Sequence, residues 1–446
     1  MEELLNLPND KIRDTKILLI ESGALAKIPS VLMENFYGNS FQLVADSTTY
    51  EIAGKEIEEN LIKKGLTLEK SIIFPVEGLY ARYEFVDQLV DEFKKHRAIP
   101  IAVGSGTIND LVKRSAFVSQ RRYICVATAA SMDGYTAYGA SITANGAKQT
   151  FDCPAPYCCI ADVDLIRNAP TEYTASGYAD LFAKVTAGAD WIIADALGIE
   201  PIDNEVWHLV QGALHTALAE PDKIRERDLE ETRNLIEGLI IGGFGMQVHQ
   251  TSRPASGAEH QMSHLWNMEH HTNKGEAISH GFQVAVGTML ITALYYELLK
   301  SDIEGLDIDE ALTHWPTREE LEQESLALFE GTDFPTIGAT ETLAKYNDHE
   351  EVREQLELLK RVWPSLKVRL EKQLIPLDEV IARLQAIGAP SKPEDIDVSR
   401  AYLKRSCIRA QYIRRRFTLL DLGVRTNLLP KWLDNLFGKG GIWEIN

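Results

Sequence analysis

Histidines gather in one short stretch of this sequence. Five of the 11 histidines lie between Ser256 and Thr288: His260, His264, His270, His271 and His280. The histidine side chain is suited to metal ligation and to proton transfer near neutral pH, and it offers no large advantage in packing. The stretch therefore predicts a place where a metal ion is held or a proton is moved.

The spacing of three of these histidines suits a metal site. His260 and His264 are four residues apart on one face of a helix that we expect to begin near Ser256, and a second helix is expected to begin near His280. A carboxylate ligand can come from Asp180, in the segment GYADLFAK. Two imidazoles and one carboxylate leave coordination positions open for a substrate, and a divalent ion held in this way can polarise a carbonyl group.

Each histidine also has a plainer interpretation, as a surface or helix-capping residue. That interpretation is the one we expect for His270 and His271, which lie in the polar stretch EHHTN. For His260 and His280, spacing alone leaves both interpretations open. The sequence contains no HExxH motif, so a zinc protease is not indicated.

The elements that must position these residues change character along the chain. In the first third, short apolar stretches alternate with helical ones, which predicts a parallel sheet with right-handed crossovers. From about Thr171 onward the spacing is helical. We therefore predict an α/β domain over residues 1–168 and an all-α domain over residues 169–446. The expected strands are Lys16–Ser22, Phe41–Asp46, Ser71–Pro75, Ala98–Gly104 and Tyr123–Ala130.

Open α/β sheets bind ligands at the carboxyl ends of their strands. The segment GSGTINDLVK, from Gly104 to Lys113, combines glycines with a helix expected to begin near Asn109, which suits a pyrophosphate group or a plain strand-to-helix turn. Asp46 ends the second strand, where an acid can bind a ribose 2′-hydroxyl group or simply cap a helix. The loop around Asp133 is rich in small residues, which suits contact with a flat ring or merely a tight turn.

Composition limits the class of protein. The 446 residues are 45% hydrophobic and 25% charged, and the formal net charge of −20 would repel nucleic acid and anionic membranes. The five cysteines include no CxxC pair and suggest neither a disulfide framework nor a cysteine zinc site. The N-terminal MEELLNLPNDKIR lacks an apolar signal core, and we expect no membrane-spanning segment. These features predict a soluble cytoplasmic protein without membrane insertion.

Five segments together resemble the superfamily of iron-dependent alcohol dehydrogenases and dehydroquinate synthases. They are GSGTINDLVK, ATAASMDGYTAYGASIT, GYADLFAKVTAGADW, SRPASGAEHQMSH and SHGFQVAVGT. Within the superfamily, SMDGYT, the GYADLFAK helix and SRPASGAEH are most similar to the sn-glycerol-1-phosphate dehydrogenases, and AQYIRRRFTLLDLG is similar to their bacterial form. The resemblance extends from about residue 16 to about residue 425. It implies that residues 1–168 form a dinucleotide-binding domain, that residues 169–446 bind metal and substrate, and that the active-site cleft lies between the two domains.

This resemblance implies roles for individual residues. The metal ligands of the family fall on Asp180, His260 and His280, and His264 becomes a candidate catalytic proton carrier or substrate contact. Asp133 is implied to be a catalytic residue close to the nicotinamide and the substrate. The implied cofactor-binding residues are Asp46, Gly104, Ser105, Gly106, Thr107, Asp110, Thr128 and Ser131.

The implied reaction is the reversible NAD(P)H-dependent reduction of dihydroxyacetone phosphate to sn-glycerol 1-phosphate, with zinc, nickel or iron as the divalent ion. Lys184 and Arg253 are candidates by location for contact with the substrate, and a surface charge or an ion pair is the alternative for each. Asp46 favours NAD, although members of the family use both NAD and NADP. The apolar segment LIEGLIIGGFGM predicts either a buried helix or an oligomer, for which a homodimer is favoured. The expected pathway is phospholipid metabolism.

Three other functions compete with this one. A glycerol or other polyol dehydrogenase of the same superfamily would act without a phosphate group, and dehydroquinate synthase also uses NAD and a metal ion. A nucleotide-binding sensor without turnover is the alternative of a different class. The presence of Asp180, His260 and His280 together argues against a sensor, because a sensor needs no open metal site.

Overall fold

The computed structural model describes residues 14–144 and 147–445. The chain forms two compact units, one of residues 1–181 and 205–252 and the other of residues 182–204 and 253–446. The segment 1–13, in which we expect no signal sequence, lies outside the described residues. The expected cleft between two domains stays a prediction.

A parallel sheet forms the centre of the first unit. Its strand order is β1-β9-β6-β5-β2-β3, and β4 also pairs with β2. The five expected strands are confirmed, with slightly different ends, as β1 (Ile17–Glu21), β2 (Ser40–Asp46), β4 (Ile72–Phe74), β5 (Ile99–Gly104) and β6 (Ile124–Ala127). Sequence analysis missed β3 (Thr67–Leu68) and β9 (Cys158–Asp162), although β9 pairs with both β1 and β6 in the interior of the sheet.

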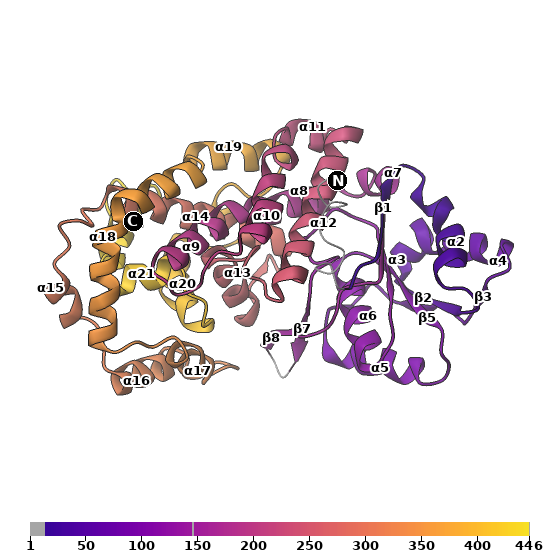
Figure 1. Cartoon of the computed structure of the whole chain (residues 1–446), viewed down its shortest axis with the longest axis horizontal. Coiled ribbons are helices and arrows are strands. Elements are labelled where there is room, and N and C mark those ends of the chain that lie inside the picture. The colour runs from indigo at the N-terminus through magenta and orange to yellow at the C-terminus, as the bar shows by residue number, and fades with distance from the viewer. Residues whose placement is uncertain (1–13, 145–146, 446) are drawn as a thin grey trace. The chain divides into compact units, whose positions relative to one another are not determined.

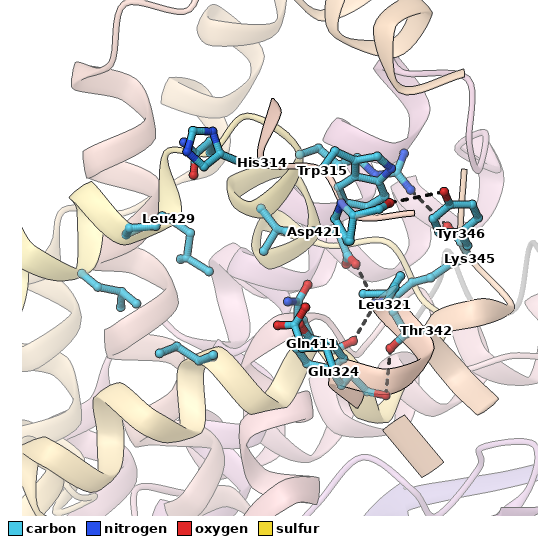
Figure 2. A pocket seen from close by; sticks show the side chains of 18 of the residues that line it. His314, Trp315, Leu321, Glu324, Thr342, Lys345, Tyr346, Gln411, Asp421 and Leu429 are labelled. Atoms are coloured by element: carbon cyan, nitrogen blue, oxygen red, sulfur yellow. Dashed lines mark hydrogen bonds and ion pairs between the residues drawn. The ribbon is translucent and has the colours of Figure 1, made fainter. Parts of the chain in front are cut away.

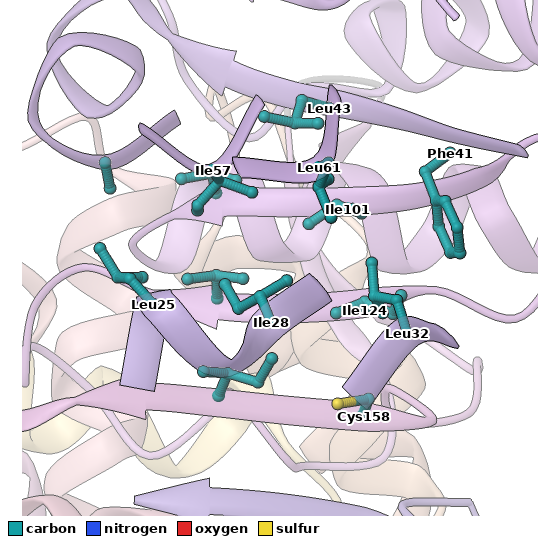
Figure 3. Close-up of a cluster of buried hydrophobic side chains, with 14 of the residues drawn as sticks. Leu25, Ile28, Leu32, Phe41, Leu43, Ile57, Leu61, Ile101, Ile124 and Cys158 are labelled. Carbon is teal, nitrogen blue, oxygen red and sulfur yellow. The ribbon is translucent and has the colours of Figure 1, made fainter. Parts of the chain in front are cut away.

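Helices cover both faces of this sheet (Figure 1). α2 (Ala24–Asn35) and α4 (Lys55–Lys63) pack over one face, and their apolar side chains join those of the strands in a buried cluster (Figure 3). α5 (Tyr83–Phe93) and α6 (Gly106–Val118) lie over the other face. Because the sheet is buried on both sides, every residue of β5, β6 and β9 is buried, as expected for parallel strands.

The compact units differ from the boundary that we expected at residue 168. α8 (Thr171–Phe182) and α12 (Leu229–His249) belong almost entirely to the sheet unit, as do α10 (Asn204–Ala217) and α11 (Pro221–Arg225). Packing explains the difference: the Gln247 side chain of α12 accepts the Thr15 N–H group at 3.2 Å and donates to the Thr136 carbonyl at 2.8 Å. Helical spacing does not show which compact unit a helix packs against.

The sheet unit also contains α3 (Ser47–Thr49), η1 (Tyr50–Gly54), α7 (Val163–Arg167) and the hairpin of β7 (Ala140–Ala144) and β8 (Ala147–Phe151).

The second unit is helical, as predicted for the later part of the chain. α9 (Lys184–Ala196), α13 (Ala258–Met268) and α14 (His280–Lys300) pack on one another. A short hairpin of β10 (Thr272–Asn273) and β11 (Glu276–Ala277) joins α13 to α14. The other elements are α15 (Ile308–Thr313), α16 (Arg318–Leu328), α17 (Ile337–Leu343), α18 (His349–Gln373), α19 (Leu377–Ile387), η2 (Pro393–Ile396), α20 (Arg400–Ala410), η3 (Gln411–Ile413), α21 (Leu419–Arg425) and α22 (Leu429–Phe437).

One helix of the described residues is long and apolar enough to cross a membrane. This helix is α14, whose 21 residues have a mean hydropathy of 1.4 in their most apolar window. However, 89% of that window is buried within the protein. Its apolar side chains are therefore those of a core helix, which must be hydrophobic on all sides.

Candidate metal centre

Two adjoining helices position the three histidines. His260 lies in the first turn of α13, His264 follows one turn later, and His280 is the first residue of α14. The imidazole centroid of His280 lies 5.3 Å from that of His260 and 6.2 Å from that of His264. Close packing of the helices depends on Gly287, because a methyl group there would lie 2.6 Å from the carbonyl oxygen of Glu259. Both helices begin close to the expected positions, which were near Ser256 and near His280.

A different contact positions the carboxylate. Asp180 lies in the last turn of α8, which ends two residues later at the start of the helical unit. The helix packs tightly at Gly177, where a methyl group would lie 2.0 Å from the carbonyl oxygen of Ala130. The backbone N–H group of Asp133 donates to Asp180 Oδ2 at 3.0 Å. The loop that carries Asp133 therefore orients the carboxylate of Asp180.

Asp180, His260 and His280 offer one ligand atom each, and these atoms lie within 4.8 Å of one another. Asp180 and His260 are buried, and His280 is half-buried. Two imidazole nitrogens and one carboxylate oxygen fit a divalent transition metal and leave coordination positions open. His264 is not a member of this group. The arrangement agrees with the ligand set implied by the sequence, and these residue roles stay predictions.

A buried carboxylate supports His260. Glu259 Oε1 accepts hydrogen bonds from His260 Nδ1 at 2.8 Å and from the Gly257 N–H group at 2.6 Å, and Oε2 accepts one from Thr186 Oγ1 at 2.8 Å. Burial raises the pKa of Glu259, but the hydrogen bonds from His260 and Gly257 outweigh it and hold the pKa below its usual value. With its Nδ1 proton directed at a carboxylate, His260 presents Nε2 as the ligand atom.

A hydrogen-bond network similarly supports His280. Ser263 Oγ lies 3.2 Å from His280 Nδ1 and donates to Gln283 Oε1 at 2.8 Å. Asn267 Nδ2 donates to the same Gln283 oxygen at 2.8 Å and to the Ser263 carbonyl at 2.9 Å. Because the Ser263 hydroxyl proton is used on Gln283, its oxygen accepts the Nδ1 proton of His280. The Nε2 atom of His280 is then left to bind metal.

Sequence analysis missed these supporting residues. The glutamate beside the first histidine and the serine three residues after it are visible in GAEHQMS, but residue types alone do not show which way they point. Gln283 lies one helical turn after His280, and this spacing indicates only that the two side chains lie on the same face of a helix. The hydrogen bonds in the structure identify all three.

The nucleotide loop differs in detail from the expectation. α6 begins at Gly106, three residues earlier than the expected start at Asn109, so Gly106 and Thr107 lie in its first turn with Ser105 preceding them. The early start places the free N–H groups of the helix directly after β5, where they can bind an anion. At Gly104, a side chain would meet Ile108 at 2.7 Å, so this position requires glycine.

Other predicted cofactor residues hold the fold around this loop. Asp110 is half-buried and accepts the Ser141 N–H group at 3.2 Å. Desolvation raises its pKa, although the charge of Lys113 opposes the rise. The Thr128 N–H group donates to the Gly104 carbonyl at 3.2 Å. Ser131 Oγ lies 3.4 Å from the Tyr135 hydroxyl group. These contacts of the three residues are internal to the protein, and their cofactor roles stay predictions.

Lys113 holds the loop that contains Asp133. Its side chain is buried, and Nζ donates to the carbonyl oxygens of Gly134 at 2.9 Å, Ala137 at 2.9 Å and Gly139 at 3.0 Å. A buried ammonium group is stable only when its donors are satisfied, and here three carbonyls do so. Sequence analysis noted this lysine only as the end of the glycine-rich segment.

Asp46 adopts the helix-capping role that we named as its alternative. Its Oδ1 atom accepts the N–H groups of Thr48 and Thr49, both at 2.8 Å, at the start of α3. One carboxylate oxygen thus serves the cap. The contact of Asp46 with a ribose stays a prediction.

The two cationic substrate candidates are both fully buried. Lys184 is the first residue of α9. Arg253 is not a surface charge, which was the alternative interpretation that we gave for it. Arg253 donates to the carbonyl oxygens of Phe417 and Asp190, each at 2.9 Å, and its Nε atom lies 3.2 Å from Glu200 Oε2. These contacts commit the guanidinium group to the protein interior and favour a structural role for it.

Substitution of Glu259 tests the support of the metal ligands. Glu259→Gln keeps the shape of the side chain but removes the charge that orients His260, so we expect metal affinity to fall by about 10- to 100-fold. The measurement is zinc affinity by competition with a chelator, and circular dichroism checks the fold. The matched control is Glu322→Gln on the exposed surface of α16. Equal zinc affinity in the two variants would contradict the role of Glu259.

Comparisons with known proteins identify relatives of this chain. The family described as iron-containing alcohol dehydrogenase matches residues 19–170. A glycerol-1-phosphate dehydrogenase of Halalkalibacterium halodurans is 35% identical over 59% of this chain and 66% of its own length. A glycerol-1-phosphate dehydrogenase of Staphylothermus marinus is 34% identical over 62% of this chain and 77% of its own. The alignment with the first relative thus spans slightly less than two thirds of that protein.

The fold is shared with solved structures. A glycerol dehydrogenase from Schizosaccharomyces pombe superposes with a TM-score of 0.60 over 94% of this chain and 90% of its own, at 15% identity. At that identity the likeness concerns the fold alone, whereas the sequence relatives indicate the branch. The chain belongs to the iron-containing alcohol dehydrogenase family, among the glycerol-1-phosphate dehydrogenases.

Proposed function

We propose that the protein reduces dihydroxyacetone phosphate to sn-glycerol 1-phosphate, reversibly, with NAD(P)H and one divalent metal ion. The observation that carries the proposal is the open set of Asp180, His260 and His280, in a chain whose relatives are named NAD(P)+ glycerol-1-phosphate dehydrogenases. A site with two imidazoles, one carboxylate and open positions suits a carbonyl substrate.

Different residues of the chain would carry out different parts of this reaction. Asp180, His260 and His280 would hold the ion, which when bound supplies a Lewis acid for the carbonyl oxygen. His264, one helical turn after His260, would deliver the proton to the oxygen of the new alcohol. The first turn of α6 would bind the pyrophosphate of the cofactor, and the loop held by Lys113 would keep Asp133 in place beside Asp180.

The phosphate of the substrate requires a cation, and we assign it to Arg416. Its Nη1 atom donates to the Ser256 carbonyl at 2.6 Å, two residues before α13 begins. Burial, and next the charge of Arg253, lowers the pKa of Arg416 to about 9, and burial also lowers the pKa of Arg414. Cationic groups crowded in this way are stabilised by an anion. The site lies at the end of α13 that carries His260.

The remaining details of the function belong to the same proposal. Zinc, nickel and iron all suit the ligand set, so the native ion is not chosen by the residues. The free oxygen of Asp46 favours NAD over NADP, since a 2′-phosphate would be repelled. The homodimer, the cytoplasmic location and the role in phospholipid metabolism stay predictions.

A polyol dehydrogenase is the competing function. The S. pombe structure carries that name, but its likeness extends only to the fold. The crowded arginines near α13 favour a phosphorylated substrate over glycerol.

Turnover tests the proposed function directly. NADH oxidation with dihydroxyacetone phosphate is followed for the protein as isolated, after chelation, and after separate addition of zinc, nickel or iron(II). We expect activity that is lost on chelation and restored by a divalent ion, with sn-glycerol 1-phosphate as the product on chiral analysis. Turnover of dihydroxyacetone and glycerol but not of dihydroxyacetone phosphate would instead support the polyol dehydrogenase. NADH binding without any turnover would support the sensor.

The phosphate assignment is tested by a pair of neighbouring arginines. Arg416→Gln should lower kcat/KM for dihydroxyacetone phosphate by about 10- to 100-fold, because a charged hydrogen bond contributes about 1.5–3 kcal/mol. Activity with unphosphorylated dihydroxyacetone should be unchanged. The control is Arg415→Gln, since Arg415 is exposed and paired with Glu341 at 2.8 Å. An equal loss of kcat/KM with both substrates would show that Arg416 only holds the Ser256 carbonyl in place, and it would contradict the phosphate assignment.

A further inference from the structure

The helical unit contains a partly open cavity of a size that takes small molecules. The cavity has a volume of about 360 Å³ and is lined by residues of α16, α17, α20, α21 and α22 and of the segment before α16 (Figure 2). Cavities of roughly 300–1,000 Å³ with mostly apolar walls and a few polar groups are typical of ligand sites. None of the three predicted metal ligands lines this cavity.

Part of the wall consists of aromatic rings held in place. Trp315 and Tyr346 stack with ring centroids 6.1 Å apart and planes at 15°. The Trp315 Nε1 atom donates to the Asn347 carbonyl at 2.9 Å, and the Tyr346 hydroxyl group donates to the Pro316 carbonyl at 3.3 Å. Leucines at other positions complete an apolar surface. The wall therefore favours a ligand with a flat, apolar body.

Three charged groups are buried in the same wall, and only two of them form an ion pair. Lys345 Nζ lies 2.6 Å from Asp421 Oδ1, and both side chains are at most 10% exposed. Arg425 is 4% exposed and directs its two terminal nitrogens at Gln355 and at the Lys345 carbonyl. Among the described residues, Arg425 forms no ion pair, and its buried Nε atom has no hydrogen-bond partner. Lys404 and Asp434 of the lining form an ion pair, and Glu324 accepts a hydrogen bond from Tyr412. Arg425 is thus a buried cation of the wall that has no ion-pair partner among the described residues.

The surroundings of Arg425 explain why this charge is costly. Burial lowers the pKa of Arg425, and only the charges of Asp421 and of Glu351, an exposed residue on α18, oppose it. Its guanidinium group lies 5.6 Å from the ring centroid of Trp315 and 4.9 Å from that of Phe417, so aromatic faces replace a counterion. A carboxylate in the cavity would supply the missing negative charge and a hydrogen-bond acceptor at the same time.

We propose that this cavity is a second binding site, for a small monocarboxylate with an apolar ring. The carboxylate would pair with Arg425, and the ring would lie against Trp315 and the leucines of the wall. The proposal does not depend on the reaction of the metal centre, because it requires only residues of the helical unit that line the cavity.

Phenylacetate and its neutral analogue phenylacetamide test the proposal on the full-length protein. Isothermal titration should show phenylacetate binding at one site per chain, about tenfold or more tighter than phenylacetamide, a difference of about 1.4 kcal/mol. Comparable affinities for the two compounds would overturn the role of the buried charge. Failure of phenylacetate to bind at all would overturn the site.

Two tryptophan substitutions locate the binding. Ile408 lines the cavity yet is 41% exposed, so Ile408→Trp should fill the space without unfolding α20, and phenylacetate binding should be lost. Val368→Trp is the matched control, because Val368 is 62% exposed on α18 and does not line the cavity. Binding that persists in Ile408→Trp, or that Val368→Trp abolishes equally, would place the carboxylate elsewhere and refute the proposal.

Discussion

The buried carboxylates beneath the first turn of α13 are the constraint on which the helical side of the site depends. Glu259 binds His260 and the N–H group of Gly257, while Asp190 accepts the Ala258 N–H group at 2.7 Å and the Leu419 N–H group at 2.8 Å. Burial, and next the charge of Glu259, raises the pKa of Asp190 to about 7. Two adjacent carboxylates can be kept in an interior only if donors surround them. Here the donors come from α9, α13 and the residue before it, α14 and the start of α21. The orientation of the first histidine is therefore determined by residues that never touch a substrate.

In the sheet unit, a buried cation is likewise stabilised by the hydrogen-bond partners that surround it. Lys113 is buried and satisfied by three carbonyl oxygens, which holds the loop of Asp133, and the backbone of Asp133 in turn holds the carboxylate of Asp180. The close approach of α8 at Gly177 places that carboxylate one turn further along the helix. Asp180 and His260 are thus each supported by a buried charged residue, whereas the uncharged Ser263 and Gln283 support His280.

Sequence analysis identified the parts of this arrangement that periodicity and residue type encode. The alternation of apolar strands and helices predicted the parallel sheet, and the four-residue spacing of His260 and His264 predicted a helix that carries both. Strand β9 was missed, because CCIAD contains a single β-branched residue and therefore gives a weak strand signal. Arg253 shows a second limit: its place in the sequence suggested a substrate contact, but only coordinates show that three internal oxygens surround its guanidinium group. Partners distant in sequence, such as Thr186 for Glu259, leave no trace in local spacing.

The most direct test of the central claim is a diffraction measurement at the absorption edge of the bound metal. Crystals of the zinc-loaded protein should show one anomalous peak per chain, about 2.0–2.2 Å from Nε2 of His260, Nε2 of His280 and a carboxylate oxygen of Asp180. His264 should remain outside the coordination shell. A peak bound by His264 in place of His280, or a peak that lies away from these three residues, would contradict the account of how this chain holds its metal.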